Sequence, residues 1–255
     1  MRRSGRVRGS VARERPLGAE LQWTAVERPD GAPMRGSHVL LRPLETADAE
    51  PLYSVSHPPG GDAAVWTYLP DGPYENPEQL RQTIAWAQGL DDRVYYTILE
   101  LREERPSGWA SYLRIKPEFG VVEIGHIWFA PALQRTTAAT EAIFLLARHA
   151  FDDLGYRRLE WKCNALNAAS RRAAERFGFS LEGVFRQHQV IKGRNRDTAW
   201  YAITDDEWPA IRLGFERWLD PQNFDARGQQ LRSLRETIAE ARAVSEAARG
   251  STRAP

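Results

Sequence analysis

VVEIGHIWFAPALQRTTAATEAIFLLARHAF, residues 121–151, is the stretch of sequence that decides the fold. It predicts a strand over residues 121–129, a Pro-containing turn, a polar loop over residues 134–137 and a helix that ends near residue 151. A loop that leads into a helix N-terminus leaves backbone N–H groups unpaired, and their summed dipole attracts an anion. The stretch therefore predicts a phosphate site, with an ordinary strand-to-helix connection as the alternative.

A second unit of this kind follows. Residues 157–183 read RRLEWKCNALNAASRRAAERFGFSLEG and predict a strand over residues 157–163, a short loop, a helix and another strand. Asn167 is expected to cap the helix, and Gly178 is expected to end it in a left-handed conformation. Each unit thus predicts a strand that leads through a loop into a helix.

Two short motifs in these units resemble the signatures of a known superfamily. QRTTAA at residues 134–139 occupies a Q/R-x-x-G-x-G/A pyrophosphate loop, and NAAS at 167–170, followed by ERFGF at 175–179, matches N-x-x-S…E-K-x-G-F. The chain from about residue 23 to about residue 234 therefore resembles the Gcn5-related N-acetyltransferase (GNAT) superfamily, most closely its ribosomal-protein alanine acetyltransferase (RimJ/RimL-like) branch. Thr and Ala stand where the superfamily usually has glycines, so we expect ordinary backbone dihedrals in this loop.

The resemblance implies an α+β (α/β/α layered) acetyl-CoA N-acyltransferase fold. Its sheet is mixed and mostly antiparallel, splayed between the strands at 121–129 and 157–163, with helices on both faces. The residues themselves predict an antiparallel meander that ends at residue 129, and a hairpin over residues 182–204. Helical spacing of apolar residues beyond residue 221 predicts a last helix, packed on the body or across a homodimer.

Acetyl-CoA is the co-substrate that the resemblance implies. Its pantetheine would lie between the splayed strands like an extra strand, and its diphosphate would rest on the N–H groups of residues 135–139. Arginines on the helix after Asn167, including Arg171, could meet the adenosine phosphates, although a solvated helix face is the alternative. The residues expected to bind the cofactor are Trp128, Phe129, Ala130, Gln134, Arg135, Thr136, Thr137, Ala138, Ala139, Asn167, Ser170, Arg172 and Arg176.

Acetyl transfer to an amine needs a base, a polarised thioester carbonyl and a proton for the departing thiolate. Glu123 is our first candidate for the base, followed by Glu160 and His126; a solvent-facing strand residue is the alternative for each. Backbone N–H groups in the 128–130 region would polarise the carbonyl. The resemblance assigns the thiolate's proton donor to Ser170, since Ala174 occupies the position of the usual tyrosine; Ser170 could also serve only local backbone groups.

A long Pro- and Gly-rich loop over residues 56–74 is expected to form part of the acceptor wall. Trp66, Tyr68 and Tyr74 supply its aromatic surface, unless these rings only cover the core edge. The sequence thus predicts an acetyl-CoA-dependent N-acetyltransferase that acts by direct attack in a ternary complex on a primary amine, either a protein N-terminus or a small amine. A catalytically degenerate CoA-binding sensor or scaffold is the alternative. A third reading is an RNA- or ribosome-associated protein.

Composition limits the remaining classes. The chain has 255 residues and a net charge of +1, so no global field recruits nucleic acid or membrane. No apolar run approaches the roughly 18 residues that cross a bilayer, and no secretory signal is visible, so we expect a cytoplasmic protein. Cys163 is the only cysteine and the histidines show no ligand spacing, so we expect no disulfide and no metal.

The ends differ in composition from the middle. Residues 1–20 are rich in Arg and nearly devoid of groups that can be buried, which predicts a disordered tail. This tail is where the RNA reading would place its contacts. Residues 21–220 are expected to form the acetyltransferase domain, and residues 221–255 a helical extension with a frayed end. Arg greatly outnumbers Lys, which we attribute to a GC-rich, bacterial genome.

Overall fold

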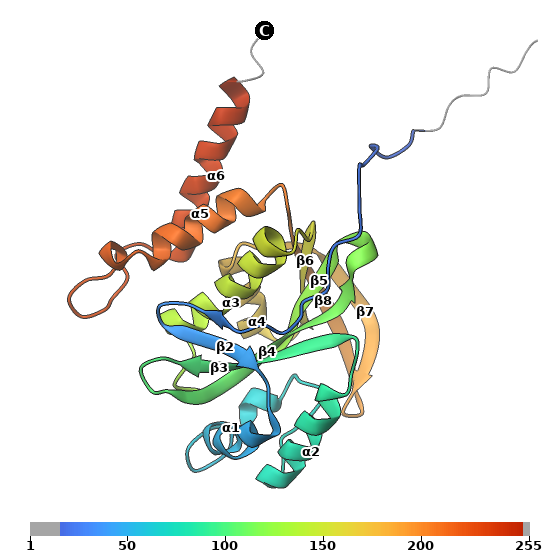
Figure 1. Ribbon diagram of the computed structural model, residues 1–255, viewed down its shortest axis with the longest axis vertical. Coiled ribbons are helices and arrows are strands. Elements are labelled where there is room, and N and C mark those ends of the chain that lie inside the picture. The colour runs from blue at the N-terminus through green and yellow to red at the C-terminus, as the bar shows by residue number, and fades with distance from the viewer. Residues whose placement is uncertain (1–15, 252–255) are drawn as a thin grey trace, which may run out of the picture.

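A single eight-stranded sheet organises the protein, whose computed structural model describes residues 16–251 (Figure 1). The strand order is β1-β2-β3-β4-β5-β6-β8-β7. The strands, all antiparallel to their neighbours except β5 and β6, are β1 (Met34–Arg35), β2 (Val39–Pro43), β3 (Arg93–Glu100), β4 (Arg105–Lys116), β5 (Val121–Phe129), β6 (Arg158–Asn164), β7 (Ser180–Ile191) and β8 (Arg194–Thr204).

Helices cover both faces of the sheet. They are α1 (Ala49–Ser56), α2 (Pro77–Gln88), α3 (Thr137–Arg148, continued by a π-helical turn at His149–Asp153), α4 (Ala168–Arg176), α5 (Trp208–Leu219) and α6 (Leu234–Ser251). Neighbouring residues of β4 point to opposite faces: Trp109 joins the core under α1 and α2, whereas Ala110 joins the larger core under α3 and α5. The predicted α+β layering, with a mixed and mostly antiparallel sheet and helices on both faces, is confirmed.

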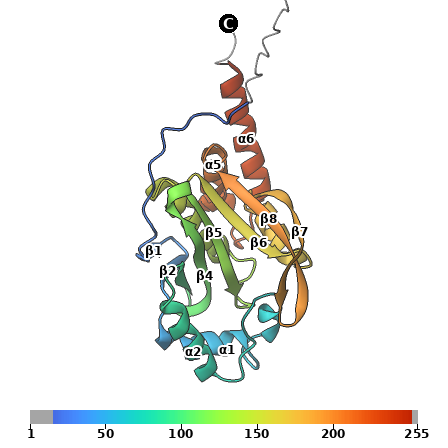
Figure 2. The same ribbon diagram turned by 90° about the vertical axis from the view of Figure 1, so that its right-hand side faces the viewer.

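The sheet opens between β5 and β6 (Figure 2). The two strands pair in parallel only from Val121 to Glu123, opposite Arg158 to Glu160. Beyond this point, β5 bends at a bulge in its pairing with β4, where His126 takes a left-handed φ of 49°. A bulge increases local twist and re-aims the strand. The predicted splay is therefore present, and it begins directly after Glu123.

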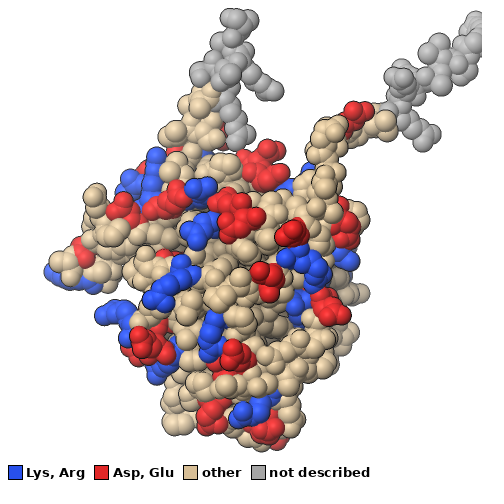
Figure 3. Space-filling model, in the orientation of Figure 1, with Lys and Arg blue, Asp and Glu red and all other residues tan. Residues whose placement is uncertain are grey.

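The helix that follows residue 221 lies on the body of the protein. Leu234, Ile238 and Ala241 of α6 are buried, and α6 packs along α5. Gly214 of α5 makes this close approach possible, because a Cβ there would lie 2.7 Å from the Cα of Ile238. Most of the predicted tail at 1–20 and the last residues of the extension fall outside the described residues. On the face shown in Figure 3, basic and acidic side chains are interspersed.

Candidate active site

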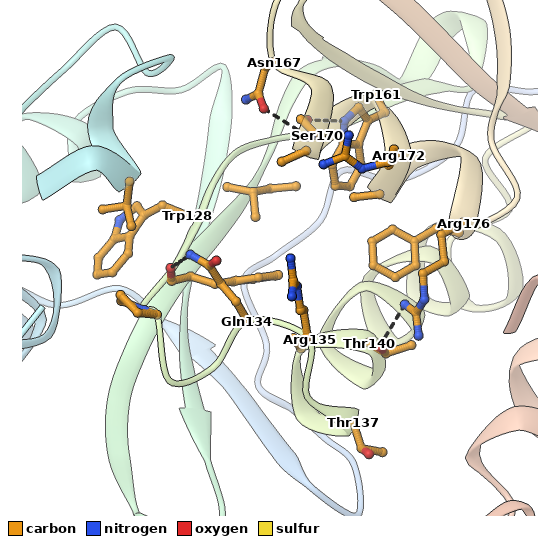
Figure 4. Close-up of a pocket in the computed structure, with 18 of the residues that line it drawn as sticks. Trp128, Gln134, Arg135, Thr137, Thr140, Trp161, Asn167, Ser170, Arg172 and Arg176 are labelled. Atoms are coloured by element: carbon orange, nitrogen blue, oxygen red, sulfur yellow. Dashed lines mark hydrogen bonds between the residues drawn. The ribbon is translucent and has the colours of Figure 1, made fainter. Parts of the chain in front are cut away.

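A cavity of about 950 Å³ fills the gap between β5, the N-terminus of α3 and α4 (Figure 4). Main-chain and side-chain groups from both predicted motifs line it. The C-terminal segment adds a wall through Trp218, Phe224 and residues 228–230. Of the residues expected to bind the cofactor, those that line the cavity are Trp128, Phe129, Gln134, Arg135, Thr137, Ala139, Asn167, Ser170, Arg172 and Arg176.

The N-terminus of α3 presents free donors to this cavity. The Thr136 hydroxyl caps the helix by accepting from Ala139 N–H at 3.1 Å. Within the described residues, the N–H groups of Thr137 and Ala138 find no acceptor. Such donors, with the helix dipole, suit a phosphate. Ala138 does not line the cavity, and its side chain is buried in the core, so only its unpaired N–H remains available to a ligand.

Our expectation of ordinary dihedrals in this loop was wrong. Arg135 takes a φ of 64°, in the left-handed region that favours glycine. The loop therefore turns into the helix as a glycine-rich loop would, but it carries a long cationic side chain at the turn. In Figure 4, this side chain points into the middle of the cavity.

Substitution at Arg135 separates these two features. Arg135→Ala and Arg135→Gly both remove the guanidinium, and we expect each to weaken acetyl-CoA binding about tenfold, as loss of one charge-assisted contact does. Only glycine adopts the left-handed backbone without strain. The free energy of unfolding of the Gly variant should therefore be about 1 kcal/mol higher than that of the Ala variant. Calorimetric titration and denaturant unfolding measure the two effects. Unchanged affinity in both variants would remove Arg135 from the phosphate site.

Two of the three arginines of α4 face the larger cavity. Arg172 and Arg176 line it, whereas Arg171 turns away and donates to the Tyr201 hydroxyl at 3.2 Å. Arg176 donates to Thr140 Oγ1 at 3.0 Å and lies over the rings of Phe177 and Trp218. Burial lowers its pKa, and no carboxylate is paired with it in the described structure. A partly buried cation without a protein counter-ion in the described structure is suited to a ligand phosphate.

Ala130 does not take part in the site. Its N–H donates to the Ser107 carbonyl at 2.8 Å, and its side chain lies in the core under α1 and α2. The expectation that it binds cofactor or polarises the carbonyl is therefore not supported. Trp128 lines the cavity but is only 3% exposed, and the Phe129 carbonyl accepts from Gln134 Nε2 at 3.0 Å.

A second cavity of about 350 Å³ adjoins the first. The walls that they share include Ile127, Trp161, Asn167 and Ser170, so the two cavities meet where β5 and β6 separate. Ser170 is held at this junction: its N–H donates to Asn167 Oδ1 at 3.0 Å, and its Oγ accepts from Trp161 Nε1 at 3.0 Å. The alternative for Ser170 was that its hydroxyl serves only local backbone groups. The contact with the Trp161 side chain goes beyond that role.

The two strand carboxylates belong to a buried ion-pair network. Lys162 Nζ lies 3.0 Å from Glu123 Oε2 and 2.6 Å from Glu160 Oε2, with only 3% of its side chain exposed. Glu123 also binds Arg114 at 2.5 Å, and Glu160 binds Arg158 at 2.8 Å. Glu123 lines the second cavity, whereas Glu160 lines neither cavity. The alternative for both carboxylates was a position on the solvent-facing side of the strand, and neither lies there, since both are buried.

His126 lines the second cavity from the bulge of β5. Its Nδ1 lies 2.5 Å from the Tyr95 hydroxyl. Burial, aided by Arg93 and Arg114, lowers the pKa of His126 to about 4. The imidazole is therefore neutral at pH 7 and can accept a proton.

The pKa of His126 predicts a loss of stability in acid. Between the unfolded value of 6.5 and the folded value of about 4, the unfolded chain binds a proton that the folded chain does not. The free energy of unfolding should therefore fall by up to about 3 kcal/mol as the pH falls through this window. His126→Asn, which tolerates the left-handed backbone, should flatten the slope in denaturant unfolding between pH 7 and 4. An equal slope in both proteins would contradict this origin.

The aromatic residues of the long loop were expected either to form part of the acceptor wall or to cover the edge of the core, and the structure divides them between these positions. Trp66 is fully buried and Tyr74 nearly so, in a cluster with Trp109 and Trp128. They cover the core and line neither cavity, so their expected role in the acceptor wall is not supported. Tyr68 lines both cavities, and its hydroxyl donates to the Leu166 carbonyl at 3.3 Å.

The charged residues of the second cavity that sequence reasoning missed include Asp71 and Arg196. Burial raises the pKa of Asp71. Arg196, on β8, has a buried Nε without a hydrogen-bond partner in the described structure. Asp71 belongs to the loop expected to be functional and Arg196 to the predicted hairpin, but no motif marks either residue.

Comparison with known proteins identifies the family. The family model described as Acetyltransferase (GNAT) domain matches residues 38–180, which is more than half of the chain. The chain belongs to the GNAT acetyltransferase family. It is therefore an acetyltransferase, and members of its family use acetyl-CoA.

Individual relatives agree with this assignment. A GCN5-related N-acetyltransferase structure from Brucella melitensis is 40% identical with a TM-score of 0.82, covering 86% of this chain and 99% of its own. The ribosomal-protein-serine acetyltransferase of Escherichia coli is 29% identical over 129 residues, 50% of this chain and 72% of the relative. The Bacillus subtilis protein named probable N-acetyltransferase YjcK is 27% identical over 180 residues, 68% and 99% of the two chains. The resemblance to the ribosomal-protein branch is confirmed.

Two further observations concern the described part of the chain. No group of three His, Cys, Asp or Glu side chains there is arranged to hold a metal ion. No helix within residues 16–251 has the length and apolar character needed to span a membrane.

Proposed function

We propose that this GNAT acetyltransferase moves an acetyl group from acetyl-CoA to a primary amine, by direct attack of the amine within a ternary complex. One observation carries the proposal: two cavities meet at the opening between β5 and β6, and Ser170 stands at their junction. The larger cavity has free N–H donors and arginines for phosphates. The smaller cavity has room and proton-accepting groups for the amine.

Acetyl-CoA fits the larger cavity by the chemistry of its walls. The free N–H groups of Thr137 and Ala138, with Arg135, would hold the diphosphate, and Arg172 and Arg176 the other phosphates. The edge that β5 presents beyond Glu123 has no partner strand on the β6 side. It can pair with the amides of pantetheine as it would with a strand.

The transfer forms a bond from the acceptor nitrogen to the acetyl carbon and breaks the bond from that carbon to sulfur. The amine must first lose a proton, because amines of pKa about 8–10 are mostly charged at neutral pH. Asp71, Glu123 and His126 all line the second cavity and can take this proton through water. Ser170 gives its hydroxyl proton to the departing thiolate and regains one from solvent.

The acceptor is an amine of either a protein N-terminus or a small molecule. The name of the Escherichia coli relative, ribosomal-protein-serine acetyltransferase, favours a protein acceptor. The volume of the second cavity, about 350 Å³, is at the lower end of ligand sites and admits only a few residues or a small amine.

A thiol-release assay tests the proposal. The full chain is incubated with acetyl-CoA and a panel of N-terminal peptides and small amines, and CoA release is followed with mass spectrometry of the products. We expect amine-dependent release of CoA and a product heavier by one acetyl group. A clear thermal shift with acetyl-CoA but no turnover across the panel would instead favour the CoA-binding sensor.

A further inference from the structure

The ionisable groups that line the second cavity are mostly paired within the protein. Arg93 binds both carboxylate oxygens of Asp92, at 2.7 and 3.0 Å. Arg114 and Lys162 both bind Glu123, as described above. These cations are already neutralised and gain little from a further anion.

Arg196 is the exception among the cations of this cavity. No ion pair or hydrogen bond of its side chain exists in the described structure, and its Nε is buried without a partner. Glu123 lies near enough to influence Arg196 electrostatically, but its Oε2 already binds Arg114 and Lys162. A buried, unsatisfied donor on a charged group is costly, so a ligand that supplies an acceptor there gains affinity.

The position of Arg196 relates this free cation to the chemistry. Arg196 shares the cavity wall with His126 and Ser170, and its charge contributes to lowering the pKa of His126. A group bound to Arg196 would therefore belong to the same small molecule, or the same few residues, as the reacting amine.

We propose that the acceptor carries a carboxylate close to its amine, and that Arg196 binds this carboxylate and so determines specificity. A single free guanidinium matches the single charge and two oxygens of a carboxylate. A phosphate, with a charge of about −1.5 to −2, would leave part of its charge without a free partner. The inference rests on the proposed amine acetylation and names the class of amine.

Two sources of this chemistry fit: a small amine with an acidic side chain, and a peptide whose side chain near the N-terminus is acidic. Matched acceptors distinguish them. Aspartic acid amide is compared with asparagine amide, and a peptide beginning Ser-Asp with one beginning Ser-Asn. Each pair has the same shape and amine and differs only in the carboxylate.

In the thiol-release assay we expect the acidic member of at least one pair to have a kcat/KM about ten- to hundredfold higher, as a charge-assisted contact gives. In Arg196→Gln this ratio should fall to near one. Arg194→Gln is the matched control: it lies on the same hairpin, is exposed and lines neither cavity, so the ratio should stay high.

Equal rates within both pairs, or a ratio that survives in Arg196→Gln, would overturn the proposal. A faster reaction with phosphoethanolamine than with either acidic acceptor would overturn the choice of carboxylate. If no amine reacts, the proposed function is wrong. The role of Arg196 in binding a carboxylate is then tested separately, by measuring the binding of the acceptor amides. Aspartic acid amide should still bind the CoA-loaded protein more tightly than asparagine amide does in calorimetric titration, and Arg196→Gln should abolish the difference; equal binding would overturn it.

Discussion

Lys162→Met should lower the free energy of unfolding by about 3–5 kcal/mol, the largest stability effect we expect from one substitution. The ammonium bridges Glu123 of β5 and Glu160 of β6 at the last paired position before the strands separate. It also lies 3.6 Å from the centre of the Trp200 ring, a contact that burial strengthens. Methionine has a similar length but leaves two largely buried carboxylates short of a cation.

Denaturant unfolding at pH 7 measures this effect, and an exposed ion pair provides the control. Arg81 binds Glu78 at 3.1 Å with 43% and 63% of the side chains exposed, so Arg81→Met should cost at most about 0.5 kcal/mol. Removing the stranded charges as well, in Lys162→Met with Glu123→Gln and Glu160→Gln, should recover part of the loss. A cost below about 1 kcal/mol for Lys162→Met alone would contradict the desolvation argument.

Features set by local sequence were the predictable ones. The strand Val121–Phe129 has the predicted bounds, and Asn167 caps α4 as expected. Gly178, with a φ of 90°, ends the helix in the left-handed conformation that the sequence predicts. Each of these depends on residues within a few positions of one another.

Features that depend on distant pairing were not predictable from one sequence. Glu123 and Glu160 become neighbours because of the parallel register of β5 and β6, and only this register places Lys162 between them. Their pattern as lone strand carboxylates is the same whether they face solvent, a ligand or a buried lysine. The free guanidinium of Arg196 likewise depends on how the β7–β8 hairpin lies against the rest of the site.

The prediction of ordinary backbone dihedrals in the loop at Arg135 was wrong for a different reason. The absence of glycine was taken to exclude a left-handed backbone, but the cost of that conformation for a single residue is only about 1–2 kcal/mol. Surrounding structure can impose it: Thr136 N–H donates to the Leu133 carbonyl, and the Thr136 hydroxyl caps α3. The position therefore keeps the turn of a glycine loop without its glycine.

Ser170→Ala should lower kcat about a hundredfold and leave the dissociation constant of acetyl-CoA nearly unchanged. General acid catalysis contributes about 10²–10⁴-fold, and the thiolate loses its donor when the hydroxyl is removed. The phosphates, by contrast, would be held by other groups, at α3 and at Arg172 and Arg176, of which α3 and Arg176 lie away from Ser170 (Figure 4). Single-turnover kinetics and calorimetric titration measure the two quantities on the same protein.

A structural cost accompanies this substitution and must be separated from the catalytic one. Trp161 Nε1 donates to Ser170 Oγ, so the alanine leaves an indole N–H unsatisfied at about 1–3 kcal/mol of stability. Ser170→Thr keeps a hydroxyl at the same place and should recover most of the rate. If Thr restores stability but not turnover, the geometry of the hydroxyl is decisive; if Ala turns over like the wild type, Ser170 has no part in proton transfer. Parallel loss of acetyl-CoA affinity in Ala would instead assign Ser170 to binding, because proton donation acts only once the thioester is in place.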